Sequence, residues 1–373
     1  TSGSTGVPKG CMLEYGNITA FCRWYRRYYG IDSDSRIAAY ASFGFDASMM
    51  DIYGAITNGA QLHIIPEEIR LDFMGLQSYF DENGITHSFM TTQVGRQFAL
   101  EMKCKSLKYL SIGGEKLVPC EPPKGYTFIN AYGPTETTIF ITLFEVDKYY
   151  PNVPIGKALD NAKLYIADKF GHMLPPGACG ELMITGWQVS RGYLNKPEKT
   201  AEVYTKNIYD DTPGYEVMYH SGDVARYLPD GNIQIIGRKD SQVKIRGFRI
   251  ELSEVEEVIR RYPGIKDATV VAFDEQGGGK YIAAYVVSDS EVDINALNNF
   301  IKETKPPYMV PAVTMQIDKI PLNQNQKVNK KALLMPERKA AEIIKPQNEV
   351  QQKLFDCIAE VLGYTEFGIT TDI

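Results

Sequence analysis

The chain has 373 residues, of which 44% are hydrophobic and 23% are charged, and its formal net charge is −6 at pH 7. This composition is that of an ordinary folded protein of two or three domains, and its acidic balance excludes broad electrostatic attraction to nucleic acid or to an anionic membrane. The six dispersed cysteines, the lack of a signal peptide and the lack of an apolar stretch of membrane-spanning length favour a reducing, cytoplasmic location.

Residues 36–133 alternate between short apolar runs and amphipathic runs. One helical pattern starts after Asp46, a candidate N-cap, and stops at Asn58-Gly59; another starts after Asp72 and stops at Asn83-Gly84. This strand–helix alternation predicts an α/β fold with a mainly parallel sheet flanked by helices. The candidate strands are residues 36–42, 60–66, 87–91, 109–113 and 127–131.

Residues 155–238 contain short strands with little helical pattern between them. Asp230-Gly231 lies between two of them and predicts a tight hairpin. We expect a small antiparallel, barrel-like section here. Its candidate strands are residues 162–167, 180–185, 217–219, 224–228 and 233–236.

Residues 241–334 predict a small α+β unit. Ser253 and Glu256 form a candidate capping box for a helix after a strand at 243–250, and Asp293 is the candidate cap of a second helix. Further strands are expected at 268–273, 281–287 and 313–317. Residues 335–346 resemble a linker, and residues 348–362 predict one more helix.

The motif TSGSTGVPKG occupies residues 1–10. Its glycines let the backbone approach a ligand closely, and its hydroxyls and Lys9 suit a polyphosphate, although a flexible surface turn is the alternative. Gly10 follows Lys9 where a Walker A loop has Ser or Thr, which argues against a P-loop NTPase. Because the chain begins inside this motif without a methionine, we expect further sequence upstream.

The motif NAYGPTETT occupies residues 130–138. Tyr132 offers a flat face for a base, while Thr135 and Glu136 offer a hydroxyl and a carboxylate to phosphate and Mg²⁺. Taken alone, the peptide also fits a strand-ending turn with a solvated glutamate.

Two further motifs lie in the second half of the chain. YHSGDVARYLPDG (219–231) precedes GRKDSQVKIRGFRIEL (237–252), and Asp223 and Arg238 suit the two ribose hydroxyls of a nucleotide. The basic residues here have too few aromatic neighbours for nucleic-acid binding, and a solvated edge strand is the alternative. Lys327 lies in NQNQKVNKKAL, and on local grounds alone a lone lysine near a chain end is usually a solvated surface residue.

The order and the residues of these motifs closely resemble those of the adenylation domains of nonribosomal peptide synthetases, which belong to the adenylate-forming superfamily. FDAS (45–48), GELMITGWQVSRGYL (180–194) and PPYMVP (306–311) complete the series, which covers nearly all of residues 1–334. Gln326 departs from the family's usual glycine, and Val224 and Ser253 are mild variants. Residues 348–364 resemble the first helix of a phosphopantetheine carrier domain, and the chain ends before the serine that bears the cofactor.

The resemblance implies a division of the chain into lobes. Residues 1–238 are expected to form a large lobe, truncated at its start, and residues 239–334 a small lobe that turns about a hinge at Asp240. A linker at 335–346 and a partial carrier domain at 347–373 follow.

The resemblance also implies two half-reactions, with ATP and Mg²⁺ in the first and the carrier's phosphopantetheine thiol in the second. An amino-acid carboxylate attacks the α-phosphorus of ATP, and the thiol then takes the aminoacyl group. Lys327 contacts the reacting oxygens, Thr135 touches the α-phosphate, and Glu136 holds Mg²⁺. Lys9 and the loop hold pyrophosphate, Tyr132 stacks on adenine, and Asp223 and Arg238 bind ribose. The nucleotide-binding set comprises Thr1, Ser2, Gly3, Ser4, Thr5, Gly6, Asn130, Ala131, Tyr132, Gly133, Asp223 and Arg238.

Alignment with the family implies an amino-acid pocket in which Asp46 holds the substrate ammonium group. Most of its expected lining is apolar, with Ser111 the one hydroxyl, so a charged substrate side chain is left unpaired there. We therefore expect a medium-sized hydrophobic L-amino acid: Leu, Ile, Val, Met or Phe. Besides Lys327, the lining residues are Asp46, Ala47, Met50, Phe89, Ser111, Gly113, Ala131, Ile139 and Phe140.

Two alternatives remain open. An acyl-CoA or aryl-acid ligase of the same superfamily has no use for the carboxylate of Asp46, and a non-catalytic carrier-docking module has no use for intact Lys9, Glu136, Asp223 and Lys327. The expected partners are an amino acid, ATP, a carrier domain and neighbouring synthetase modules, with no nucleic acid and no membrane.

Overall fold

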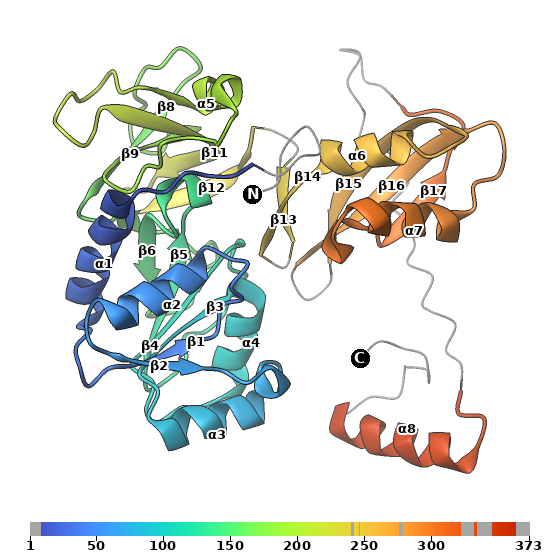
Figure 1. Ribbon diagram of the computed structural model, residues 1–373, viewed down its shortest axis with the longest axis horizontal. Coiled ribbons are helices and arrows are strands. Elements are labelled where there is room, and N and C mark those ends of the chain that lie inside the picture. Colours follow the sequence, from blue (N-terminus) through green and yellow to red (C-terminus); the bar gives the residue numbers. More distant parts are fainter. Residues whose placement is uncertain are drawn as a thin grey trace.

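The structure is a computed structural model that describes residues 9–239, 242–245, 247–275, 279–321, 332–333 and 345–362. Figure 1 shows a large lobe, a smaller lobe beside it, and helix α8 (Glu349–Leu362) set apart from both. Helix α8 confirms the helix predicted over residues 348–362. The domain limits named above stay predictions.

A seven-stranded sheet forms the centre of the large lobe, with the order β2-β1-β3-β4-β5-β6-β7. The first five strands in this order are parallel, β6 pairs antiparallel with β5, and β7 pairs antiparallel with β6. The predicted mainly parallel sheet is therefore confirmed. The strands are β1 (Arg36–Ala39), β2 (Gln61–Ile64), β3 (His87–Thr91), β4 (Tyr109–Gly113), β5 (Thr127–Tyr132), β6 (Thr142–Glu145) and β7 (Lys157–Ala158).

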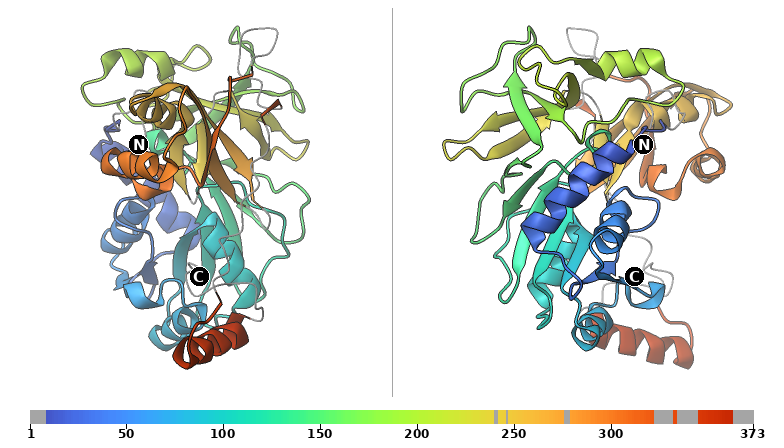
Figure 2. Two further views of the ribbon diagram at one scale, coloured as in Figure 1. Left: turned by 90° about the vertical axis from the view of Figure 1, so that its right-hand side faces the viewer. Right: turned by 60° about the vertical axis from the view of Figure 1, so that its left-hand side comes forward.

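Helices cover both faces of this sheet. Leu76 and Phe80 of α3 (Phe73–Asn83) and Phe98 of α4 (Thr92–Glu101) pack in one buried cluster with alternate residues of the strands. Helices α1 (Tyr15–Tyr29) and α2 (Ala47–Ile56) pack in another cluster that includes the remaining strand residues. The right-hand view of Figure 2 shows α1 lying across the sheet. Burial on both faces explains why these strands are near-continuous apolar runs.

The ends of two helices test the cap predictions. Asp72 accepts a hydrogen bond from the Gly75 amide at 3.1 Å, as an N-cap does, and Gly84 ends α3 in the left-handed conformation at φ 64°. Asp46 occupies the N-cap position of α2, but its side chain caps no helix amide. The predicted capping role of Asp46 is wrong, because its carboxylate faces a different partner, described below.

The barrel-like section is antiparallel, with β10-β11-β9-β8 in order and β12 paired to β11. Two predicted strands are one long strand, β11, whose register shifts between His220 and Val224. The hairpin at Asp230-Gly231 is confirmed, and Gly231 has φ 80°. Bounds are β8 (Ala162–Ala167), β9 (Gly180–Gly186), α5 (Pro197–Val203), β10 (Tyr204–Lys206), β11 (Val217–Tyr227) and β12 (Ile233–Arg238).

The small lobe packs two helices on a sheet of order β15-β16-β17, and a separate hairpin, β13-β14, precedes them. The single strand predicted over 243–250 is wrong, because the chain reverses at Gly247, where φ is 80°. The Asp293 cap is confirmed by a hydrogen bond from the Ala296 amide at 3.0 Å. Bounds are β13 (Gln242–Ile245), β14 (Phe248–Glu251), α6 (Leu252–Arg260), β15 (Ile265–Asp274), β16 (Lys280–Ser288), α7 (Ile294–Thr304), η3 (Pro307–Met309) and β17 (Val313–Gln316).

The predicted capping box of α6 is also wrong. Ser253 lies inside the helix, which begins at Leu252. Glu256 instead reaches the neighbouring strand, where its Oε1 accepts hydrogen bonds from the Val270 amide at 2.8 Å and the Thr269 hydroxyl at 3.0 Å.

A buried ion pair lies in the small lobe. Lys305 Nζ donates to Glu254 Oε1 at 2.6 Å, and the side chains are only 6% and 2% exposed. We expect Lys305→Ala to lower the free energy of unfolding by about 3–5 kcal/mol, because it leaves a buried carboxylate without its cation. Chemical denaturation measures this loss. Replacing both Lys305 and Glu254 with leucine should lower the free energy of unfolding by less than Lys305→Ala does, because no unpaired buried charge remains.

The matched control is Lys280→Ala, because Lys280 forms a more exposed pair with Asp274. This control should change stability little, since exposed ion pairs are worth little. Equal losses at Lys305 and Lys280 would contradict the prediction.

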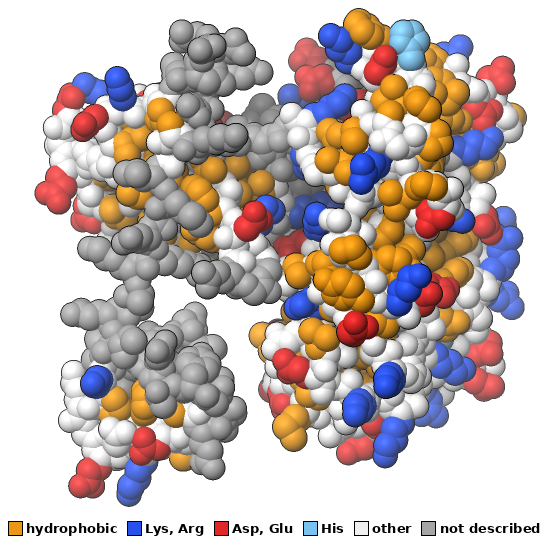
Figure 3. All heavy atoms as spheres, turned by 180° about the vertical axis from the view of Figure 1, so that it is seen from behind, with side chains coloured by type: hydrophobic (Ala, Val, Ile, Leu, Met, Phe, Trp, Pro, Cys, Tyr) orange, Lys and Arg blue, Asp and Glu red, His pale blue; other side chains and the backbone are white. Residues whose placement is uncertain are grey.

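None of the helices in the described ranges combines the length and the apolar character needed to cross a bilayer. On the face shown in Figure 3, Lys and Arg side chains are interspersed with Asp and Glu over the large lobe.

Candidate active site

A cavity of about 880 Å³ lies between the lobes, at the carboxyl ends of the parallel strands. Phe89, Gly113 and Ala131 line it from β3, β4 and β5 respectively. Ligands bind at this end of open α/β sheets, and the volume is that of a small-molecule site.

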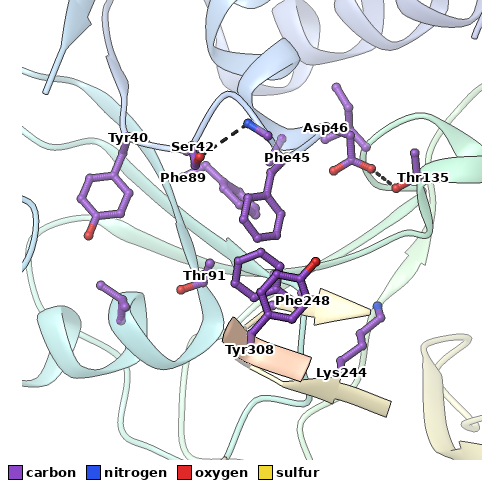
Figure 4. A pocket seen from close by; sticks show the side chains of 18 of the residues that line it. Tyr40, Ser42, Phe45, Asp46, Phe89, Thr91, Thr135, Lys244, Phe248 and Tyr308 are labelled. Atoms are coloured by element: carbon purple, nitrogen blue, oxygen red, sulfur yellow. Dashed lines mark hydrogen bonds between the residues drawn. The ribbon is translucent and has the colours of Figure 1, made fainter. Parts of the chain in front are cut away.

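Asp46 lines this cavity. Its Oδ2 accepts a hydrogen bond from Thr135 Oγ1 at 2.5 Å, and Thr135 belongs to the short 3₁₀ helix η2 (Thr135–Thr137). Burial raises the pKa of Asp46, while the bond from Thr135 and the charge of Lys244 act in the opposite direction. Figure 4 shows the Lys244 ammonium group pointing toward this same corner. A partly buried carboxylate held in this way is suited to bind a cationic group.

The backbone after η2 is strained. Thr138 and Ile139 have φ values of 58° and 73°, and a β-branched residue rarely adopts such values. Gln188 holds this segment, because its Nε2 donates to the carbonyls of Thr138 at 3.2 Å and Phe140 at 3.0 Å. Gly133 is needed opposite, since a Cβ there would lie 2.3 Å from the Phe140 Cα atom. The strain thus brings Ile139 and Phe140 to the cavity wall.

The remaining residues of the predicted pocket divide into two layers. Ala47, Phe89, Gly113, Ala131, Ile139 and Phe140 line the cavity together with Asp46. Met50 and Ser111 are buried but do not line it. The Ser111 hydroxyl is 2.7 Å from the Tyr29 hydroxyl, so it is already engaged beneath the cavity. The accessible wall is therefore more apolar than the sequence alone indicated.

The predicted ribose residues meet at the mouth of the barrel-like section. Asp223 and Arg238 are partners across β11 and β12, with Arg238 Nη1 donating to Asp223 Oδ1 at 2.8 Å, and both line the cavity. The Tyr132 hydroxyl donates to Asp223 Oδ2, and burial, then the Asp223 charge, raises the pKa of Tyr132. Tyr132 does not itself line the cavity, and Lys244 Nζ lies 5.5 Å from the centre of its ring. Its stacking on adenine stays a prediction.

Glu136 is fully buried beside the cavity. Its Oε1 accepts a hydrogen bond from the Tyr193 hydroxyl at 2.6 Å, and Lys9 Nζ lies 4.8 Å from the centre of the Tyr193 ring. The structure thereby brings Lys9 near Glu136, 127 residues further along the chain. A single carboxylate suits Mg²⁺, which takes its other ligands from substrate phosphates and water. Across the described ranges, no three or more Asp, Glu, His or Cys residues gather as a metal site.

Several predicted residues are placed elsewhere. Asn130 is buried in β5, and its side-chain amide donates to the Pro154 carbonyl at 2.8 Å, away from the cavity lining. Lys327, Asp240 and the loop residues Thr1, Ser2, Gly3, Ser4, Thr5 and Gly6 lie outside the described residues.

The small lobe closes the cavity with aromatic side chains. Phe248 of β14 stacks on Tyr308 with ring centres 3.9 Å apart, and Phe45 of the large lobe lies 4.7 Å from Phe248 (Figure 4). The β13-β14 hairpin therefore faces the pocket in this structure.

Sequence reasoning missed Gln188 and Tyr193 as residues that shape the site. Both lie in GELMITGWQVSRGYL, which was recognised as a family motif without roles for its members. Their partners are about 50 residues away in sequence, so no local pattern indicated the contacts.

Sequence comparison assigns the chain to a family. A profile described as AMP-binding enzyme matches residues 1–194, and one described as AMP-binding enzyme C-terminal domain matches residues 254–327. Since the first match spans more than half of the chain, the chain belongs to the AMP-binding enzyme family.

Curated relatives that match include peptide synthetases, and the chain spans only a small part of their length. The chain is 41% identical over 374 residues to bacitracin synthase 1 of Bacillus licheniformis. This alignment covers 100% of this chain and 7% of that protein. The resemblance to adenylation domains of nonribosomal peptide synthetases, a class of amino-acid adenylating ligases, is confirmed.

Two solved structures share this fold. The Vibrio cholerae adenylation domain AlmE, in complex with glycyl-adenosine-5'-phosphate, matches with TM-score 0.75 and 26% identity over 88% of this chain and 64% of that one. A nonribosomal peptide synthetase protein containing adenylation and PCP domains, bound to a vinylsulfonamide inhibitor, matches with TM-score 0.77 and 26% identity over 99% of this chain and 63% of that one.

Proposed function

We propose that the chain activates a hydrophobic L-amino acid with ATP and passes it to the phosphopantetheine thiol of a carrier domain. The observation that carries this proposal is the meeting of Asp46 and Thr135 with Asp223 and Arg238 around one cavity. The first pair suits an amino acid and its reacting carboxylate, and the second pair suits a ribose.

In the first half-reaction, a carboxylate oxygen bonds to the α-phosphorus of ATP, and the bond to pyrophosphate breaks. Two anions must approach one another, so positioned cations and donors lower the barrier. Asp46 orients the substrate by its ammonium group, and the Thr135 hydroxyl beside it is available to the α-phosphate. Glu136 would hold Mg²⁺, which would neutralise charge on the phosphates. Lys9 supports the departing pyrophosphate, and Lys327 contacts the reacting oxygens.

In the second half-reaction, the carrier thiol loses its proton, its sulfur bonds to the carbonyl carbon, and AMP leaves. The position of the β13-β14 hairpin against the cavity supports a role for this hairpin in the second step. Lys327 must approach the same nucleotide in the first step, so the small lobe takes two orientations, with Asp240 as the hinge.

The apolar wall supports a hydrophobic substrate. Phe89, Ile139 and Phe140 line it, while the Ser111 hydroxyl is engaged with Tyr29, so this part of the wall offers no partner to a charged side chain that has lost its water.

We expect Gly113→Ala to shift the preference toward smaller amino acids. A Cβ atom at Gly113 would lie 2.9 Å from the Ala131 carbonyl oxygen and 3.3 Å from Phe89 Cζ, so the added methyl group crowds a wall that Gly113, Ala131 and Phe89 form together. The ratio of kcat/KM values for the largest accepted amino acid and for alanine should fall roughly tenfold. Gly16→Ala, at an exposed position of α1 where the added Cβ atom meets nothing within 4 Å, is the matched control and should leave the ratio unchanged. An unchanged ratio would contradict the placement of Gly113 in the pocket.

ATP–pyrophosphate exchange across the standard amino acids, on the complete synthetase module, tests the proposal. We expect exchange with one or a few of Leu, Ile, Val, Met and Phe. Preferred exchange with Asp, Lys or Arg would overturn the pocket assignment. A CoA thioester formed from an acid without an amine would favour the acyl-CoA or aryl-acid ligase, and absence of nucleotide binding would favour a carrier-docking module.

A further inference from the structure

The tip of the β13-β14 hairpin is bound to the large lobe by a hydrogen bond to one carboxylate. The Gly247 amide donates to Glu115 Oε1 at 2.7 Å, across 132 residues of sequence. Glu115 follows β4, directly after Gly114, at the edge of the cavity. This bond joins one group from each lobe, so it exists only while the hairpin is docked.

The backbones around this bond touch closely. A Cβ atom at Gly114 would lie 3.3 Å from the Gly247 Cα atom, and a Cβ atom at Gly247 would lie 3.3 Å from Thr91 Cγ2. Both glycines have positive φ values, 107° and 80°, that L side chains rarely adopt. The backbone at Gly247 and the backbone at Gly114 therefore pack in direct contact, with no room for a side chain between them.

Contacts within the large lobe also hold Glu115. Its Oε2 accepts from Gln93 Nε2 at 3.3 Å, its backbone amide donates to Thr92 Oγ1 at 3.1 Å, and the Thr92 hydroxyl donates back to the Glu115 carbonyl at 3.2 Å. These contacts do not involve the hairpin, so they can orient the carboxylate for the Gly247 amide and reduce the ordering that docking costs.

We propose that Glu115 is a positioning residue for thioester formation: it anchors the small lobe in the orientation of the second half-reaction. This inference rests on the proposed function. Losing the acceptor lowers the population of the docked orientation relative to any orientation that lacks the bond. The first half-reaction, which needs Lys327 at the nucleotide, does not use the bond.

The test measures both half-reactions of Glu115→Ala in the complete synthetase module. We expect ATP–pyrophosphate exchange within about twofold of the unmodified protein, and transfer of the aminoacyl group to the holo carrier slowed roughly tenfold, the effect of losing one hydrogen bond to a charged group. Glu115→Gln keeps an acceptor oxygen and should recover most of the transfer rate. Normal exchange also shows that each variant is folded.

Glu101→Ala is the matched control. Glu101 also accepts a hydrogen bond from a glutamine, Gln97 at 3.0 Å, but that pair is exposed and lies within α4. Glu101→Ala should leave the rates of ATP–pyrophosphate exchange and of aminoacyl transfer unchanged. Equal loss of both half-reactions in Glu115→Ala would overturn the inference, as would an unchanged transfer rate with normal exchange. Absence of amino-acid-dependent exchange in the unmodified protein would instead overturn the proposed function itself.

Discussion

Replacing Asp46 with asparagine is expected to lower kcat/KM for the amino acid by about 10²-fold or more. The carboxylate is the partner proposed for the substrate ammonium group, and removing one member of a buried, hydrogen-bonded charge pair costs about 2–5 kcal/mol. Asparagine keeps the size of the side chain and an oxygen for the Thr135 hydroxyl, which now donates to Asp46 at 2.5 Å. ATP–pyrophosphate exchange at varied amino-acid concentration measures the loss.

The same substitution at Asp72 is the matched control. Asp72 caps α3 and does not itself line the cavity, and asparagine is an equally good N-cap. Burial raises the pKa of Asp46. As pH falls, the carboxylate therefore takes up a proton, and substrate binding should weaken, at a higher pH than for an exposed aspartate. Asp46→Asn should abolish that dependence. Unchanged kcat/KM in this variant would contradict the ammonium-binding role.

Lys327→Ala is expected to lower amino-acid-dependent exchange by roughly 10²-fold or more, by analogy with the loss of one oxyanion donor. The attacking carboxylate and the α-phosphate are both anionic, and no other residue is assigned to both groups of oxygens. Exchange kinetics at saturating ATP and amino acid measure the effect on kcat. Near-normal exchange would contradict the role of Lys327.

A second measurement separates this role from general damage to the small lobe. The hairpin that carries Lys244 and Phe248 is docked at the cavity, and the described contacts that hold it come from other residues. A chemically prepared aminoacyl-adenylate should therefore be transferred to the carrier by Lys327→Ala at close to the normal rate. Lys319→Ala, an exposed lysine next to β17, should leave both half-reactions unchanged.

The sequence predicted some strands to the residue. Strands β3 and β4 begin and end where predicted, because each is a short, almost fully buried run between turn residues. Strand β8 also does so, although its burial alternates at Lys163 and Tyr165. The reversal at Gly247 escaped prediction, since Val243 to Ile250 keeps an alternating pattern through the turn. Helix α1 was also missed. Its buried face is largely aromatic, with Phe21, Trp24 and Tyr25.

The sequence predicted those site residues that belong to motifs with a recognisable chemical role. Asp46, Thr135, Asp223 and Arg238 were named from the sequence, and the structure brings them around one cavity. Glu115, Gln188 and Tyr193 were not given roles, because their contacts join segments that only the folded chain brings together. The same holds for the bond between Tyr29 and Ser111, which removes the one hydroxyl expected in the pocket.

The strained segment after η2 has a consequence for altering the amino acid that such a domain accepts. Ile139 and Phe140 reach the cavity through a left-handed backbone that Gln188 ties down and that Gly133 leaves room for. A substitution of Ile139 or Phe140 alone changes the cavity wall, but the backbone conformation that positions both side chains stays the same. The smallest unit that can be grafted between domains is therefore the segment from 133 to 140 together with the glutamine at 188, rather than a set of single residues.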